Sequence, residues 1–254
     1  MYTRLLLTTE KPSPTDAYVG GGAFLPEHIP WPTCVEGLAL FHLMAIPAHW
    51  FYSQEIAEDF WFSIFIPVDV QRHTHLRQLR AGEGTSEAVV LAYRRGAASR
   101  SRCMSDSLER GRMERVECLE PDDDENLDSK LDGIDAWLQS PLTWKGGRRR
   151  LMLYGADIDD ILHSHKGVLS DGMAYLFIQD QPDLLSEDAS GRSSSNWAES
   201  DFATSRASSA PKSSSTHGVD LLGWYPRMAW IYQSPASNAS ASTCSFGECC
   251  REGG

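Results

Sequence analysis

Short apolar runs, separated by glycine, proline and polar residues, dominate the first 180 positions of the chain. The strongest runs are rich in β-branched and aromatic residues, which is typical of buried strands. We expect strands at 38–46, 60–70, 87–94, 151–154 and 173–179. The polar segment 99–115 predicts a loop or short helix, and 146–150 predicts a turn. Because no three-turn amphipathic helix is visible before residue 185, the pattern predicts a mainly β (α+β) body.

The two halves of this body repeat one order of features, at an offset of roughly 106 to 114 residues. Each half has a glycine loop, a tryptophan, an apolar strand, a break and then an aromatic strand. We therefore expect two pseudo-repeats, at about 18–95 and 130–180. Two copies are too few for a solenoid, so the pattern predicts a duplicated β-rich unit within one domain, 1–185.

The composition changes abruptly after this domain. Segment 186–254 holds 17 serines in 69 residues, and such a composition predicts a largely flexible tail. The apolar segment 221–232 interrupts the tail. We expect it either to dock on the body as a strand or to engage a partner.

Charge and hydropathy exclude some classes of function. The formal net charge of −12 repels phosphate backbones and so argues against sequence-independent nucleic-acid binding. No apolar run approaches the roughly 20 residues that a bilayer span needs. The N-terminal residues lack the apolar stretch of a secretory signal, so we expect a cytoplasmic protein with reduced thiols.

Three separated motifs carry a resemblance to a known family. They are Gly21–Cys34, which contains a glycine pair, Leu-Pro and Trp-Pro; Lys130–Gln139, which contains Asp-Gly and Trp-Leu-Gln; and Ser170–Ile178. In this order they resemble the opening, second and closing motifs of the YwqG-like family of bacterial proteins of unknown function. The resemblance covers roughly residues 18 to 180. It implies a duplicated, roll-like, mainly β fold without an agreed enzymatic activity, and its toxin–immunity settings imply a binding role.

The chain departs from that family in its cysteines. Relatives often carry Cys-x-x-Cys after Trp-Pro and again before the second central strand, whereas here Cys34 is followed by Val-Glu-Gly and 142–147 has no cysteine. A tetrahedral zinc site needs three or four thiolate or imidazole ligands. The sequence therefore lacks the zinc knuckle of the family.

Candidate chemistry is sparse elsewhere. His163 and His165 have the alternating spacing that could ligate a metal with Asp159, but exposed loop histidines are the favoured explanation of the pattern. The run Arg148–Arg150 fits a strand end that resists edge pairing, with anion capture as the alternative. There is no Gly-x-Ser-x-Gly elbow. We expect neither an enzyme nor a cofactor.

The acidic composition instead favours a basic protein partner. Carboxylates would steer such a partner, and aromatic side chains in a loop would anchor it. The candidate contacts are Asp122, Asp123, Asp124, Glu125, Trp50 and Tyr52. We predict a non-enzymatic immunity protein that neutralises a bacterial toxin. The alternative is a metal- or small-ligand-binding housekeeping protein.

Overall fold

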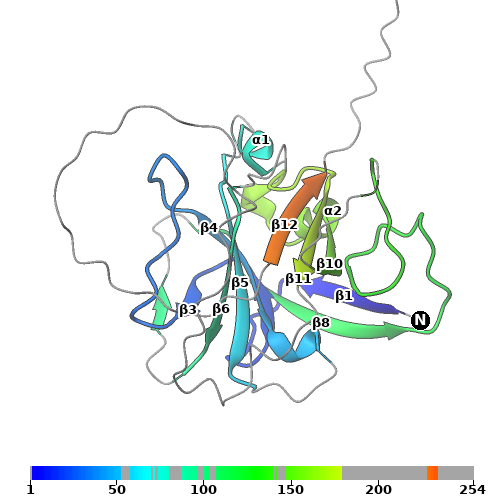
Figure 1. The fold of residues 1–254 in the computed structure, drawn as a ribbon, viewed down its shortest axis with the longest axis horizontal. Helices are drawn as coiled ribbons and strands as arrows, with labels where there is room; N and C mark the ends of the chain where they lie inside the picture. The colour runs from blue at the N-terminus through cyan, green and yellow to red at the C-terminus, as the bar shows by residue number, and fades with distance from the viewer. Residues whose placement is uncertain are drawn as a thin grey trace, which may run out of the picture.

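The computed structural model describes residues 2–52, 58–69, 71, 74–79, 87–96, 100–102, 107–139, 141, 147–178 and 228–233. Within them the chain forms strands and a few helices of at most five residues (Figure 1). The strands are β1 (Tyr2–Thr8), β2 (Ala17–Val19), β3 (Ala23–Leu25), β4 (Phe41–Pro47), β5 (Phe60–Ile66), β6 (Val89–Arg94), β7 (Arg100–Arg102), β8 (Gly111–Cys118), β9 (Lys130–Leu131), β10 (Arg148–Tyr154), β11 (Met173–Ile178) and β12 (Met228–Gln233). The helices are η1 (Ala48–Trp50), α1 (His75–Leu79), α2 (Gly155–Asp159) and η2 (His163–His165).

Ten strands form one antiparallel sheet, in the order β12-β11-β10-β9-β1-β8-β2-β4-β5-β6, and β3 pairs separately with β7. The sheet curls until its edge strands, β6 and β12, contact each other. Figure 1 shows β12 in orange beside β11, and the antiparallel strands β1 and β8 side by side near the N-terminus. The prediction of a mainly β fold is confirmed. No helix among the described residues is long and apolar enough to cross a membrane.

The two halves of the sheet share one arrangement. Read inward from either edge, the strands run backwards through the sequence and end at one central strand from elsewhere in the chain. The first half consists of β8, β2, β4, β5 and β6, and the second half of β1, β9, β10, β11 and β12. The halves meet where β1 pairs with β8, from Tyr2↔Cys118 to Thr8↔Arg112. Each half thus takes one central strand from a distant part of the chain.

The two halves also share the position of a β-bulge. In the first half the register of β4 against β5 shifts between His42 and Met44. In the second half the register of β10 against β11 shifts between Arg149 and Leu151. His42 and Arg149 each stand directly before the register shift of their strand, so they occupy corresponding places in the two halves. Such a bulge re-aims the side chains beside it.

A turn with positive φ follows the short strand of each half. Gly20 and Gly21 follow β2 with φ of 63° and 64°, and Asp132 and Gly133 follow β9 with φ of 48° and 75°. Glycine takes this conformation without the steric cost that a Cβ brings. A Cβ on Gly20 would lie 1.7 Å from the carbonyl oxygen of Glu109, so no side chain fits there.

One large apolar core lies inside the curled sheet and draws residues from both halves. Two smaller clusters cover the outer face. In the first half Trp31 packs edge-on to Phe65, with ring centroids 5.1 Å apart. In the second half Trp137 packs on Tyr175, with centroids 4.4 Å apart. Each tryptophan comes from the loop that follows the positive-φ turn, so the loop closes over its own half.

Most of the strands predicted from apolar runs form, with small shifts of their ends. The predictions for polar segments were wrong. Segment 99–115 contributes β7 and most of β8, and Arg148–Arg150 begins β10 instead of forming a turn. Strand β8 has partners on both sides, β1 and β2, whereas β7 pairs with β3, and Arg148 and Arg149 pair with β11. The polar sequences do not reveal these partners.

The tail is described only at Met228–Gln233, the β12 strand that pairs with β11. Trp230 and Tyr232 are buried there and belong to the main core. The rest of segment 186–254, including 221–227, lies outside the described residues. A part of the chain some 50 positions beyond β11 therefore completes the second half of the sheet.

Candidate functional site

A buried lysine anchors the loop that carries the acidic run. Lys130 begins β9, and its side chain is 0% exposed. Its Nζ donates hydrogen bonds to Asp122 Oδ1 at 2.7 Å and to the Asn126 carbonyl at 3.1 Å, and lies 5.3 Å from the centre of the Tyr2 ring. A buried ammonium is stable only with such partners, so this loop is fixed to the sheet.

Asp122 is the buried partner of that lysine. Its side chain is 3% exposed, and it accepts further hydrogen bonds from the Ile134 amide at 2.6 Å and from Asn126 Nδ2 at 2.8 Å. Burial acts to raise the pKa of Asp122, but the hydrogen bonds from Lys130, Ile134 and Asn126 outweigh it and hold the pKa below its usual range. Asp122 is one of the predicted partner contacts, but its side chain is buried and bonded to these three groups, so its carboxylate is not available at the surface.

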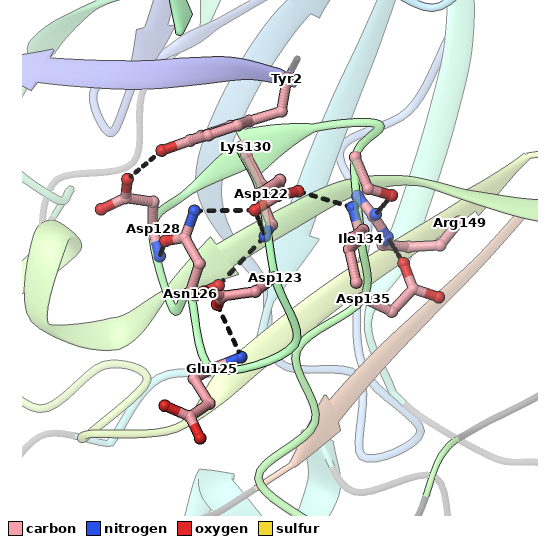
Figure 2. A network of polar contacts seen from close by, with 11 residues as sticks. Tyr2, Asp122, Asp123, Glu125, Asn126, Asp128, Lys130, Ile134, Asp135 and Arg149 are labelled. Carbon is pink, nitrogen blue, oxygen red and sulfur yellow. Dashed lines mark hydrogen bonds and ion pairs between the residues drawn. The ribbon is translucent and has the colours of Figure 1, made fainter. Parts of the chain in front are cut away.

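The next three acids point outward. Asp123, Asp124 and Glu125 are exposed, and Asp123 Oδ1 accepts the Glu125 amide at 3.0 Å (Figure 2). This bond closes a turn. Three adjacent carboxylates are thus held at the surface by a loop whose base is pinned by the Asp122–Lys130 ion pair.

A second set of contacts ties the end of the loop to β1. The Tyr2 hydroxyl donates to Asp128 Oδ2 at 2.9 Å, and Arg4 lies 3.4 Å from the same carboxylate. Burial and the hydrogen bond to Asp128 raise the pKa of Tyr2 to about 12, so the phenol stays protonated and remains a donor. Both ends of the loop are therefore anchored.

The two predicted aromatic contacts lie on a different element. Trp50 ends η1 and Tyr52 follows it, and both are half-buried against the main core. The guanidinium of Arg115 lies 4.9 Å from the Trp50 ring, and that of Arg150 lies 6.0 Å from the Tyr52 ring. Packing at the rim of the core leaves only part of each ring for a partner, and the structure does not place them within the acidic loop.

Exposed apolar side chains instead flank the acidic loop. Val116, Leu119 and Ile134 are all exposed, and Leu119 is 80% exposed. Val116 lies near the end of β8, Leu119 follows that strand, and Ile134 donates its amide to Asp122. Sequence reasoning missed them because isolated apolar residues in polar segments carry no periodic signal.

An arginine cleft lies on the other side of the same segment. It has a volume of about 370 Å³ and is lined by Asp132, Gly133, Asp135, Arg148, Arg149 and Arg150. Arg149 donates from Nε to Asp135 and from Nη2 to the Gly133 carbonyl at 2.9 Å (Figure 2). Arg150 lies 3.3 Å from Asp132. The cleft is therefore built almost entirely from charged groups.

Two of the three predicted metal ligands, His165 and Asp159, are engaged in other contacts. His163 is exposed, His165 Nδ1 lies 3.1 Å from Glu109 Oε2, and Asp159 accepts the Gly167 amide at 2.8 Å. Burial raises the pKa of Asp159, which disfavours the carboxylate that a metal needs. Among the residues described, no three His, Cys, Asp or Glu side chains come together as a metal ion would require.

No family model matches the chain, and no curated protein matches it in sequence.

Proposed function

We propose that the protein is non-enzymatic and binds another protein, most specifically as an immunity protein that neutralises a basic bacterial toxin by covering its active site. One observation carries the proposal. The exposed carboxylates of Asp123, Asp124 and Glu125 stand on a loop that a buried ion pair fixes to the sheet. The cytoplasmic compartment expected from the sequence belongs to the same proposal.

Fixed charges suit this role better than mobile ones. A preformed loop loses little conformational entropy when a partner binds. Its carboxylates, in a chain of net charge −12, attract a basic surface over distance and raise the rate of association. Steering by charge therefore supports rapid capture of a toxin.

Apolar anchors would supply the contact area. The exposed side chains of Val116, Leu119 and Ile134 border the loop, and burying them against a partner would stabilise the complex. The half-buried rings of Trp50 and Tyr52 remain proposed contacts at the margin. An apolar centre with an acidic rim is the usual anatomy of a protein interface.

We also propose that the two halves are copies of one roll-like unit, as the resemblance to YwqG-like proteins implies. Three features support it: the mirrored strand order, the bulges at His42 and Arg149, and the positive-φ turns after β2 and β9. Equivalent ion pairs add support, since Arg112 lies 3.3 Å from Asp16 and Arg4 lies 3.4 Å from Asp128. In each pair the carboxylate precedes the short strand.

The test is co-expression with the product of the toxin gene adjacent to this one in its source genome. We expect the protein to restore growth, and a purified complex to form at low salt. The triple variant Asp123→Asn/Asp124→Asn/Glu125→Gln should slow association about tenfold, measured by surface plasmon resonance, because steering depends on these charges.

The matched control is Glu36→Gln/Asp160→Asn/Asp171→Asn. It removes the same three charges from exposed positions elsewhere, and we expect less than a twofold change in the association rate. Equal slowing in both variants would assign the effect to net charge and remove the acidic loop from the interface. A toxin that kills equally well in the presence of the protein would overturn the immunity function.

A further inference from the structure

An arginine pair, Arg95 and Arg110, lies at the outer face of the first half. Arg95 directly follows β6, and Arg110 directly precedes β8. Their guanidiniums lie 3.9 and 5.6 Å from the centre of the same ring, that of Phe24 in β3. Among the residues that the structure describes, neither guanidinium forms an ion pair or a hydrogen bond with the protein. The chain thus brings two cations together without a carboxylate between them.

Aromatic rings hold the arginine pair in place. The guanidinium of Arg95 also lies 4.7 Å from the Trp61 ring, and that of Arg110 lies 4.3 Å from the Tyr18 ring. The stem of Arg110 runs along the turn after β2, where a Cβ on Gly21 would lie 3.0 Å from Arg110 Cδ. Stacking occupies the flat faces of a guanidinium and leaves its N–H groups, which lie in its plane, for a ligand. Because these long side chains are already ordered, a ligand has little of their entropy to remove.

The donors of the pair are open to a ligand. Both side chains are partly exposed. Of their nitrogens, Nε of Arg110 is buried without a partner, whereas the terminal nitrogens of both arginines reach solvent. These terminal N–H groups are the ones that a guanidinium presents to an oxyanion in a fork.

The nearest acid in the chain does not neutralise the pair. Glu109 directs its carboxylate to the Ser164 amide and to the His165 ring. Burial, together with the nearby charge of Arg110, lowers the pKa of Arg95, so the two cations repel each other. Segment 94–115 is locally basic, with seven arginines against three acids in a chain of net charge −12. The missing counter-charge therefore points to a group from outside the chain.

The two charges define the class of ligand. A carboxylate would neutralise only one guanidinium, whereas a phosphate monoester carries about −1.5 to −2 at neutral pH and offers three acceptor oxygens. Arginine binds phosphate oxygens in a bidentate fork, which a compact ammonium does not reproduce. A phosphoryl dianion therefore matches both the charge and the donor geometry of the pair.

We propose that the arginine pair binds a phosphoryl dianion, whose oxygens accept hydrogen bonds from the terminal N–H groups of Arg95 and Arg110. The phosphoryl group belongs either to a small phosphate ester or free phosphate, or to a phosphorylated side chain of a peptide. The pair lies in the first half, and the acidic loop packs on the second half. This inference does not rest on the proposed immunity function.

The experiment is isothermal titration calorimetry at about pH 7.5 and constant ionic strength, where phosphate monoesters are mostly dianions. The probes are inorganic phosphate, glycerol 3-phosphate, acetate, and an end-blocked Gly-phosphoserine-Gly peptide with and without its phosphate. We expect one saturable site for every phosphorylated probe and at least tenfold weaker binding of acetate. Binding of the phosphopeptide at least tenfold tighter than glycerol 3-phosphate assigns the site to a phosphorylated side chain, and comparable binding assigns it to small phosphates.

Two variants separate charge from geometry. Arg110→Gln removes one of the two charges, and we expect at least tenfold weaker binding of phosphate. Arg110→Lys keeps the charge but removes the fork, and we expect binding to weaken several-fold. Each variant is first checked for a native circular dichroism spectrum. As a second measurement, phosphate should raise the melting temperature of the unmodified protein, because a ligand of the folded state stabilises it, and should raise that of Arg110→Gln much less.

The matched control is Arg94→Gln. Arg94 ends β6 beside Arg95 in the chain, but its guanidinium lies 3.7 Å from Asp59. The variant removes the same charge, and phosphate binding should stay within twofold. Equal weakening in Arg94→Gln and Arg110→Gln would reduce the effect to net charge and overturn the site. So would an absence of saturable binding with the phosphorylated probes, acetate binding as tight as phosphate, or equal binding of the peptide without its phosphate.

Discussion

The two bulges differ in the side chains beside them, which are mainly aromatic in the first half and mainly charged in the second. In the first half Tyr18 and His42 are buried beside Phe65. In the second half Lys130 and Arg149 hold the corresponding strand positions, and Asp122 and Asp135 neutralise them. A register shift and a positive-φ turn accompany both clusters, so similar local backbone features carry side chains of either kind.

The difference lies in what each cluster requires from the loop above it. Aromatic rings need only to be covered, because burying their apolar surface is itself stabilising. Buried cations need carboxylates at defined positions. The loop 119–129 supplies Asp122 for that purpose and thereby presents Asp123, Asp124 and Glu125 to solvent. In this half a requirement of stability thus shapes a surface suited to binding.

The largest effect is expected from breaking the buried ion pair. Lys130→Met leaves the carboxylate of Asp122 buried without its cation, and should lower the free energy of unfolding by about 3–5 kcal/mol. The corresponding change in the other half, Tyr18→Phe, removes only the hydrogen bond to the Gly22 carbonyl and should cost about 1 kcal/mol. Urea denaturation measures both.

The double variant Lys130→Met/Asp122→Asn serves as the control for that comparison. It removes both charges, and we expect it to recover a large part of the stability lost in Lys130→Met. Similar losses in Lys130→Met and Tyr18→Phe would show that the charged cluster places no greater demand on its loop than the aromatic one.

The two clusters should also respond to acid in different ranges of pH. Burial, with the nearby charge of Arg110 adding to it, lowers the pKa of His42 from 6.5 to about 4. Below pH 6.5 His42 becomes protonated in the unfolded chain but stays neutral in the folded one. The free energy of unfolding therefore falls as the pH drops from 6.5 to about 4. A shift of this size corresponds to about 3 kcal/mol.

The charged half should lose stability over a lower range of pH. The pKa of Asp122 is held below its ordinary value of 3.8, so its contribution is present above that pH and is lost only as the pH falls below it. Unfolding free energies measured between pH 7 and 3 should show the loss due to His42 first. His42→Asn keeps a donor for Gly20 and should flatten the slope between pH 6.5 and 4, whereas the control His49→Asn should leave most of it. An unchanged slope in His42→Asn would contradict this assignment.

The smallest effect concerns the paired arginines at the centre of the sheet. Among the described residues Arg4 forms an ion pair with Asp128, whereas Arg112 lies within 3.3 Å of Asp16, Glu10 and Glu114. Such half-exposed pairs contribute about 1 kcal/mol or less. We expect Arg112→Gln to lower the melting temperature more than Arg4→Gln, and 0.5 M salt to shrink the difference. Equal shifts would indicate that the network around Arg112 adds nothing to a single pair.

Much of the strand content could be predicted because each buried strand has its own apolar signal. Phe60–Ile66 and Met173–Ile178 are apolar almost throughout, since both of their faces are covered. By contrast β8 alternates charged and apolar residues at its end and has neighbours on both sides only in the folded sheet. The prediction failed there because pairing between segments more than 100 residues apart leaves no local pattern.

In the candidate site, too, the sequence reveals the charged runs but not which of their members are buried or paired. A run of acids at 122–125 is visible in the sequence, but the burial of Asp122 depends on Lys130 and on the Ile134 amide. Likewise the run Arg148–Arg150 is visible, but the bulge and the turn at Gly133 make it a cleft. A list of charges does not reveal which of them are neutralised.

The sequence by itself determined the mainly β class, most buried strands and the acidic character of the chain, because these follow from local hydrophobicity and summed charge. Only the tertiary structure decided which acid lies inside and which face the solvent, which aspartates pair with Arg149 and Arg150, and how β1 and β12 complete a half built mostly from residues 130–178. The physical reason is that burial and pairing depend on contacts between segments distant in the chain, and those contacts exist only once the sheet has closed.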